Sequence, residues 1–225
     1  VSWNGPGRLR YLDALFTATS AVCVTGLTVV DTGLFSGFGR TVVLLLIQFG
    51  GLGLITFMTI FLANPRGRIS FASRKLIGDY YVGSVEVNPR KIVRSVVVFT
   101  LAMEIAGALC MLPVFRRTVG GGAGFYAIFH AVSAFCNAGF SLFPDSLERY
   151  VANPVINVTI MGLVVCGGIG FVVIEDLAER LVGKRRRFTL HTRLVLAVTG
   201  ALIVAGAVVY LAFEAGNAYR GMGPL

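Results

Sequence analysis

The sequence predicts an all-α membrane protein built from repeated units, each made of a helix, a short re-entrant loop and a second helix. Three observations favour this fold class: an apolar composition, helix-length apolar stretches and an internal repeat. Hydrophobic residues make up 56% of the 225 residues and charged residues only 14%, whereas about 25% of a soluble domain is charged. A chain of this composition belongs in a lipid bilayer.

Four apolar stretches are long enough to cross a bilayer, which takes about 20 helical residues. Three of them carry no formal charge, and one contains Arg94 near its start and Glu104 near its middle. In chain order the stretches are Thr41 to Ala63, Ile92 to Phe115, Val155 (or Pro154) to Ile174, and Leu194 to Phe213. Because the chain begins at Val1 and shows no signal peptide, we expect it to be part of a longer membrane protein.

The basic residues are concentrated in two loops. Seven lie between Asn64 and Arg94 and six between Arg180 and Arg193. Loops retained in the cytoplasm accumulate Lys and Arg, so the net charge of +9 indicates cytoplasmic loops and no nucleic-acid partner. The four long helices then alternate in direction, and the short stretches between them enter the membrane from outside.

An internal repeat organises the chain. The pattern F-x-A-x-S-A-x-C-x-x-G runs from Phe16 to Gly26 and recurs from Phe129 to Gly139, while GGLG at 50–53 recurs as GGIG at 167–170. The offsets are 113 and 117 residues, so two copies of one unit differ in a loop between the two patterns. We expect these glycine clusters to let each second helix pack closely on the loop.

The repeat predicts five segments. They are the rear part of a first unit (1–64), a cytoplasmic linker (65–91), a complete second unit (92–182), a cytoplasmic basic loop (183–193) and the first helix of a third unit (194–225). Glu104 and Glu214 fall at similar depths in the first helices of the second and third units, which supports this division. The chain would thus hold about half of a four-unit array.

The repeated stretches are too short and too rich in small residues to cross the membrane. Irregular backbone at membrane depth is tolerated only where protein buries it or where it lines a water-filled cavity. Backbone carbonyls around such a cavity replace the water of a dehydrated cation, and Gly supplies the positive φ that turns them. The candidate ion-binding residues are Val22, Cys23, Val24, Thr25 and Gly26 in the first copy, and Phe135, Cys136, Asn137, Ala138 and Gly139 in the second.

The short helices before these loops would point the negative ends of their dipoles at a cation. Asn137 and Thr25 are expected either to brace the loops or to offer oxygen atoms to the ion. Cys23 and Cys136 are expected to be small buried residues behind the carbonyls. Asp31 is either an acidic residue at the outer mouth or a turn residue.

Three further polar residues are candidates for functional roles. A charged residue within an apolar helix is expensive and suggests function, so Glu104 and Glu214 are predicted to support the loops by hydrogen bonds to backbone, with a direct ion or proton role as the alternative. His130 takes the place of Thr17 of the first copy, and a lone histidine is no metal site. The four cysteines lack the spacing of a zinc site or a disulfide scaffold, and no resident metal or cofactor is expected.

The chain resembles the Trk/Ktr/HKT superfamily of potassium transporters, most closely its KtrB-type membrane subunits. The resemblance rests on FTATSAVCVTGLTVVDTG, LLLIQFGGLGLITF, AFCNAGFSL, GGIGF and LHTRLV in this order and covers essentially the whole chain. It implies four channel-like units around one pore in the inner (plasma) membrane, a homodimer, and a cytoplasmic ring of nucleotide-binding RCK regulatory subunits. In this family Gly at the filter position accompanies K⁺ preference, whereas Ser in the first repeat of some plant members accompanies Na⁺; both copies here have Gly.

The sequence therefore predicts a pore subunit for selective K⁺ uptake, with K⁺ as the transported ion and no enzymatic chemistry. The alternatives are a Na⁺-permeable or Na⁺-coupled member of the same superfamily and a carrier of the alternating-access type. A membrane enzyme that uses His130 with Glu104 or Asp145 is a further alternative, disfavoured because these residues are dispersed along the chain.

Overall fold

The computed structural model describes residues 5, 9–53, 89–181 and 188–214. The chain divides into two compact units, Val1–Gly168 and Ile169–Leu225. The described residues form helices and turns without a β-strand, and the predicted all-α class is confirmed. Most of the predicted linker at 65–91, and residues 183–187 of the basic loop, lie outside the described residues.

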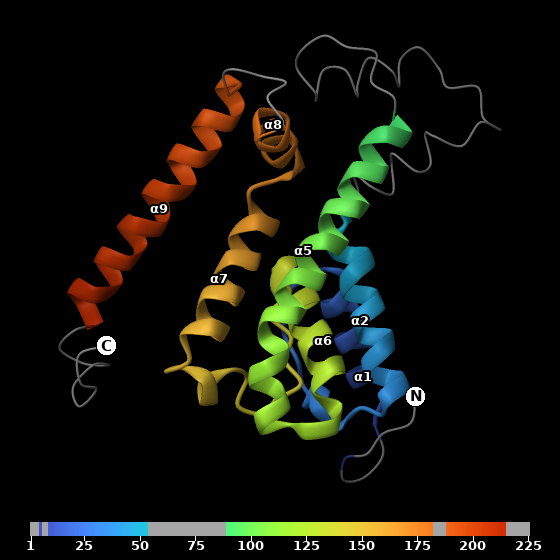
Figure 1. Ribbon diagram of the computed structural model, residues 1–225. Helices are drawn as coiled ribbons and strands as arrows, with labels where there is room; N and C mark the ends of the chain where they lie inside the picture. Colours follow the sequence, from blue (N-terminus) through green and yellow to red (C-terminus); the bar gives the residue numbers. More distant parts are fainter. Residues whose placement is uncertain (1–4, 6–8, 54–88, 182–187, 215–225) are drawn as a thin grey trace. The chain divides into compact units, whose positions relative to one another are not determined.

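The first unit contains the helices of both repeats (Figure 1). They are α1 (Tyr11–Val22), α2 (Gly37–Gly51), α5 (Pro89–Thr118), α6 (Ala123–Phe135) and α7 (Pro154–Gly168). Short 3₁₀ turns at Thr32–Leu34, Gly120–Gly122 and Glu148–Tyr150 belong to the connecting segments. The second unit contains α8 (Phe171–Leu181) and α9 (Leu190–Glu214).

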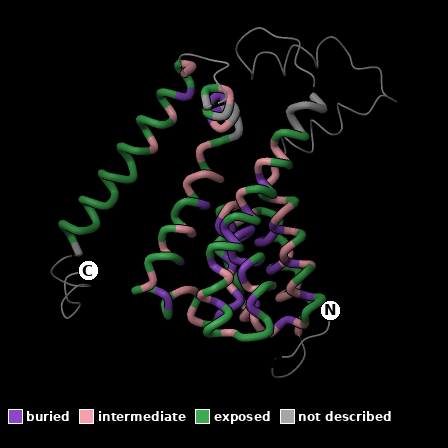
Figure 2. Tube along the Cα trace, viewed as in Figure 1, coloured by how far each residue is buried: buried purple, intermediate pink, exposed green. Residues whose placement is uncertain are grey.

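Helix α6 is the most enclosed element of the first unit and packs against α2, α5 and α7. Its small residues Ala127, Ala131 and Ala134 belong to a buried cluster with Met111 and Phe115 of α5, because small side chains let helices approach closely. Its opposite side joins a second buried cluster with α2. In Figure 2 the buried residues gather around this helix. Because its neighbours enclose α6, the start of the loop after Phe135 has a fixed position.

The predicted four continuous spans are only partly correct. Two helices of the described residues are long and apolar enough to cross a membrane, Arg94–Thr118 within α5 and Leu190–Phe213 within α9. The span predicted to end at Ile174 instead breaks after Gly168, since Gly170 has φ +89° and α8 begins at Phe171. The apolar helix α2 ends at Gly51, and Gly53 follows with φ +69°; residues 54–63 of the span predicted from Thr41 to Ala63 lie outside the described residues.

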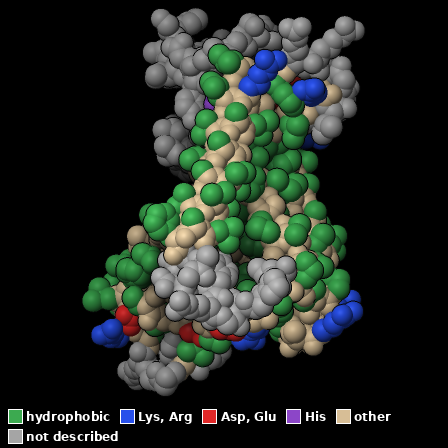
Figure 3. Space-filling model, turned by 90° about the vertical axis from the view of Figure 1, so that its left-hand side faces the viewer, with side chains coloured by type: hydrophobic (Ala, Val, Ile, Leu, Met, Phe, Trp, Pro, Cys, Tyr) green, Lys and Arg blue, Asp and Glu red, His purple; other side chains and the backbone are tan. Residues whose placement is uncertain are grey.

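Helix α9 exposes large apolar side chains on all sides, including Leu194, Val198, Leu202 and Phe213. In Figure 3 hydrophobic side chains, in green, run along the helix that faces the viewer. A helix of a soluble protein would bury an apolar stripe and expose a polar face. The all-round apolar surface fits contact with lipid or with other membrane helices.

Candidate functional site

The two repeated loops begin with the same helix cap. After α1, the amide of Val24 donates to the Ala21 carbonyl and the amide of Thr25 to the Ser20 carbonyl. After α6, Asn137 and Ala138 form the equivalent bonds to Ala134 and Ser133. This pair of bonds around a left-handed residue is the Schellman motif, and it occurs 113 residues apart on two different sequences.

Each loop contains two residues of positive φ rather than the one predicted. The glycines are Gly26 at +73° and Gly139 at +72°, and the added residues are Val24 at +56° and Asn137 at +58°. Asn tolerates this region, but a β-branched Val in it is an outlier. Because the residues between them do not share the positive φ, the backbone alternates in hand through each loop.

The two loops meet at their glycines. A Cβ atom built on Gly26 would lie 2.5 Å from the Ala138 carbonyl oxygen, and one on Gly139 would lie 3.7 Å from the Gly26 Cα. Both glycines line a cavity of about 200 Å³ together with Asp31 and Ser141. The structure thus brings together the ends of both predicted filter segments, although 113 residues separate them.

Repeated serines hold the loops to their helices. Ser20 Oγ lies 2.8 Å from Thr25 Oγ1 and accepts a hydrogen bond of 2.9 Å from the Leu27 amide. In the second copy Ser133 Oγ donates to the Phe140 carbonyl at 2.7 Å. Thr25 therefore lies against its own helix, and the serines of the repeated pattern fix the exit of each loop.

The second helix of each repeat packs on its loop through a glycine. Gly50 of α2 lies against the Val22 carbonyl, and Gly167 of α7 lies against the Phe135 carbonyl. Any side chain at either position would collide with backbone. Gly51 packs against the Cys136 side chain of the other repeat. By contrast, no described atom lies within 4 Å of a Cβ built on Gly53 or Gly170, and the positive φ of both turns the chain where each helix ends.

The two cysteines of the loops differ in exposure. Cys136 is half-buried against Gly51, whereas Cys23 is exposed, so the prediction of a buried Cys23 is wrong for this chain. The reason is geometric: the helix that would cover Cys23 as α2 covers Cys136 is not among the described residues. Asn137 is also exposed, with Nδ2 3.5 Å from the Phe135 carbonyl oxygen, and its side chain follows the loop backbone.

Asp31 has the geometry of the predicted turn residue and also lines the cavity, while its place at an outer mouth stays a prediction. Its Oδ1 accepts a 2.7 Å hydrogen bond from the Gly33 amide, as in a turn, and the residue also lines the cavity beside Gly26. Gly33 lies against the Leu142 carbonyl oxygen, 2.6 Å from a built Cβ, and its own carbonyl accepts from Arg40. The outer segment of the first repeat is therefore packed directly onto that of the second.

Glu104 lies buried in the middle of α5, only 6% exposed. Its carboxyl group is hydrogen-bonded with Gln48 of α2 and lies close to Cys136, and Oε1 is buried without a hydrogen-bond partner among the described residues. Glu104 thus joins the two repeats directly behind the second loop. Glu214 is the last residue of α9, and its side chain lies outside what the structure describes.

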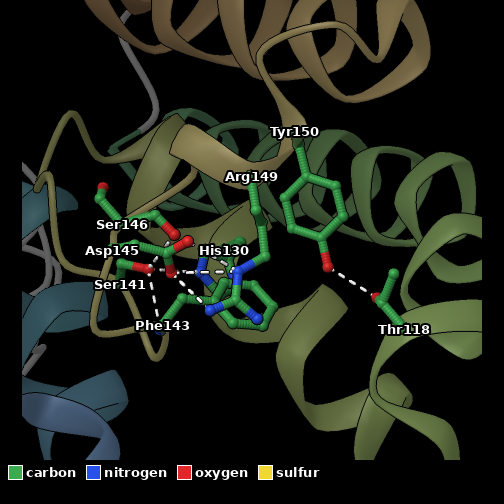
Figure 4. A network of polar contacts seen from close by, with 8 residues as sticks. All are labelled: Thr118, His130, Ser141, Phe143, Asp145, Ser146, Arg149 and Tyr150. Carbon is green, nitrogen blue, oxygen red and sulfur yellow. Dashed lines mark hydrogen bonds and ion pairs between the residues drawn. The ribbon is translucent and has the colours of Figure 1, made fainter.

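No hydrogen bond or ion pair among the described residues joins His130 to Glu104 or to Asp145. His130 is buried and contacts Tyr126 and Ser141, whereas Asp145 binds Arg149 in the outer segment (Figure 4). The Arg149 guanidinium holds the pKa of Asp145 below its ordinary value through hydrogen bonds. Among the residues described, no three His, Cys, Asp or Glu side chains are grouped to hold a metal ion.

Sequence reasoning did not single out Ser20, Ser133 or Gln48, or the positive φ of Val24. The serines carried a usable signal, because both belong to the repeated pattern. The contact between Gln48 and Glu104 carried none, since it depends on how two repeats pack.

An all-α membrane protein with a repeated helix-and-loop unit is the class that this fold and site define. A family profile described as TrkH, cation transport protein, matches residues 5–215. The chain belongs to the TrkH family of cation transport proteins.

Several curated relatives align with nearly all of the chain. It is 38% identical over 211 residues to the Ktr system potassium uptake protein B of Vibrio alginolyticus, and 40% identical over 198 residues to the protein of that name from Bacillus subtilis. It is 35% identical over 207 residues to the potassium/sodium uptake protein NtpJ of Enterococcus hirae. These alignments cover 93%, 87% and 91% of this chain but 46%, 44% and 46% of the relatives. The chain spans about half the length of the relatives it matches.

Proposed function

We propose that this chain is one half of a membrane pore subunit for selective K⁺ uptake, in which backbone carbonyls of the two repeated loops coordinate the ion. The observation that carries the proposal is the meeting of the loops. Two segments with the same cap and the same alternation of φ lie with Gly26 and Gly139 side by side in one cavity. The names of the relatives, which are potassium or potassium/sodium uptake proteins, support the choice of ion.

The contacts narrow the set of coordinating carbonyls. Those of Val22 and Phe135 lie against the glycines of the second helices, and those of Ser20 and Ala21 accept cap hydrogen bonds. Within each predicted set of five, the four residues that follow Val22 and Phe135 are therefore the better candidates. Carbonyl oxygens of this kind replace the water molecules around a cation, so the ion is dehydrated without covalent chemistry.

Half an array does not surround an ion, and the repeat geometry indicates where its neighbours would lie. Gly51 of the first repeat covers Cys136 of the second, so in a closed ring of four units the fourth unit would cover the exposed Cys23. In the complete subunit Cys23 should react with a maleimide more slowly than in the 225-residue chain. Equal reactivity in both would contradict the four-unit arrangement.

The same proposal includes a multi-pass placement in the inner (plasma) membrane, a homodimer and a cytoplasmic RCK ring. It also includes a support role for Glu104 and Glu214. All of these rest on the family resemblance and on the two basic loops. Permeation by Na⁺, or coupling to it, is the alternative within the family, since one relative is named a potassium/sodium uptake protein.

The test is K⁺ and Na⁺ uptake by the complete subunit in cells that lack their own K⁺ transporters, with Gly139→Ser compared with Gly120→Ser. Both glycines have φ +72°, so the backbone strain of the substitution is matched. Among the described residues, a Cβ built on Gly139 has one neighbour, the Gly26 Cα at 3.7 Å, and one built on Gly120 has none within 4 Å. Only Gly139 lines the cavity. We expect Gly139→Ser to lower the preference for K⁺ over Na⁺ and Gly120→Ser to leave it unchanged. Equal preference in both variants would favour the alternating-access carrier.

A further inference from the structure

A buried histidine of α6, His130, is bonded to the lining of the cavity that contains Gly26, Gly139 and Asp31. His130 of α6 is 2% exposed, and its ring packs among Phe115, Tyr126, Phe129 and Phe143, with centroid distances between 5.1 and 6.2 Å. Both ring nitrogens nevertheless have polar partners. Nδ1 lies 2.7 Å from the Tyr126 carbonyl oxygen and Nε2 lies 3.0 Å from Ser141 Oγ.

The partners determine where the protons lie. A carbonyl only accepts, so Nδ1 carries the hydrogen, and in the neutral ring Nε2 is then an acceptor. In that neutral state the Ser141 hydroxyl donates to Nε2. Its oxygen accepts from the Phe143 amide at 3.1 Å, and the Ser146 carbonyl at 3.3 Å is the longer of two possible acceptors for its hydrogen.

Ser141 is the point at which this buried network reaches the cavity. Ser141, Phe143 and Ser146 all line the cavity that contains Gly26, Gly139 and Asp31. Figure 4 shows Ser141 between His130 and Ser146. The His130 ring also stacks on the Phe143 ring, with centroids 5.1 Å apart. One side of the cavity is thus held by one hydrogen bond and one ring contact from the same buried residue.

The first repeat lacks this anchor. The residue equivalent to His130 is Thr17, which is equally buried and donates to the carbonyl of Asp13 at 2.9 Å. This is the same contact, four residues back, that Nδ1 makes with Tyr126. Thr28, the equivalent of Ser141, lines the cavity, but among the described residues no hydrogen bond joins it to Thr17, whose single hydroxyl hydrogen goes to the Asp13 carbonyl. Among the described residues, a side-chain hydrogen bond from this helix position to the cavity lining is therefore found in the second repeat and not in the first.

We propose that His130 is a positioning residue for cation uptake, which holds the Ser141 side of the outer cavity in the shape that admits the ion. This inference rests on the proposed function. If the segment around Ser141 adopts the binding shape only part of the time, the apparent affinity for the ion falls by that fraction. A hydrogen bond between neutral groups shifts such an equilibrium by about 2- to 12-fold. Where the binding shape is the minor state, loss of the bond raises the half-saturating K⁺ concentration by that factor and leaves the maximal rate unchanged.

The experiment measures K⁺ uptake against K⁺ concentration for the complete subunit and five variants. His130→Phe keeps the ring packing and removes both nitrogens, and Ser141→Ala removes the hydroxyl. The double variant tests whether the two act through one bond, and His130→Gln restores an acceptor near the Nε2 position. Thr17→Val is the matched control, because it removes only the contact within the short helix of the first repeat.

We expect the half-saturating concentration to rise about 2- to 12-fold in His130→Phe and Ser141→Ala and no further in the double variant. His130→Gln should return toward the native value, and Thr17→Val should keep it. Unchanged half-saturation in Ser141→Ala, additive effects in the double variant, or an equal rise in Thr17→Val would overturn the inference. Ser141→Ala removes a single oxygen, so it supplies the result even if His130→Phe fails to fold. A native subunit without saturable K⁺ uptake would overturn the proposed function and the inference with it.

Discussion

The same substitution at two glycines of α7 should have opposite effects on stability. Gly162 has no atom within 4 Å of a built Cβ, whereas a Cβ on Gly167 would meet the Phe135 carbonyl oxygen and lie 2.8 Å from its carbon. Gly→Ala within a helix stabilises by about 1 kcal/mol, and both variants share that gain. The difference between them therefore isolates the overpacking, which for a well-packed site is about 1–3 kcal/mol.

The assay is thermal unfolding of the purified protein in detergent, followed as the fraction that stays monodisperse by size-exclusion chromatography. For a chain of this size 1 kcal/mol corresponds to about 2–4 °C, so Gly167→Ala should melt about 2–12 °C below Gly162→Ala. Gly50→Ala should behave like Gly167→Ala, because Gly50 lies against the Val22 carbonyl. Midpoints within about 1 °C of each other for all three variants would refute the idea that the second helices press on the loops through these glycines.

Three other substitutions test the loops and the outer segment by the same assay. Ser133→Ala removes the donor to the buried Phe140 carbonyl and should destabilise by about 1–2 kcal/mol; a neutral effect would show that the bond does not hold the loop. Val24→Asn should stabilise relative to Val24→Ala by about 0.5–1 kcal/mol, since Asn tolerates positive φ, and equal midpoints would contradict the strain at Val24. Arg149 holds the pKa of Asp145 below its ordinary value, so the ion pair contributes to stability at neutral pH and is lost as pH falls through the lowered pKa. The small difference in melting midpoint between native and Asp145→Asn protein should therefore vanish in strong acid. A difference that persists in strong acid would exclude the ion pair as its cause.

Local pattern sufficed for the all-α class and for the residues that form the two loops. The repeated cysteine and glycine located both segments, because positive φ at Gly26 and Gly139 is a property of glycine itself. The break after Gly168 was not predictable, since glycine is common in continuous membrane helices and nothing in the sequence distinguishes a packed glycine such as Gly167 from a turning one such as Gly170. The sequence placed both in one cluster, and only their surroundings separate them.

Contacts between repeats lay beyond sequence reasoning for a different reason. Glu104 was recognisable as an expensive residue in an apolar helix, but its partner Gln48 lies on a helix of the other repeat. The bond from His130 to Ser141 likewise spans an irregular segment, and its geometry depends on the path of the backbone through residues 136–141. In both cases the type of residue suggested a role, and tertiary packing decided which one.

The two copies of the loop separate what the backbone needs from what the side chains add. The sequences VCVTG and FCNAG share only Cys and Gly, yet they have the same cap and the same alternation of φ. A site made of carbonyls depends on those shared features, so most side chains in it are free to differ. The informative differences are those in which a side chain makes a hydrogen bond outside its own loop. Thr17 and His130 are the clearest pair. Both bond to the carbonyl four residues earlier, and His130 also bonds to Ser141. The cavity that both repeats line therefore has, on one side, Ser141 bonded to His130 and, on the other, Thr28, for which the described residues show no equivalent bond to Thr17.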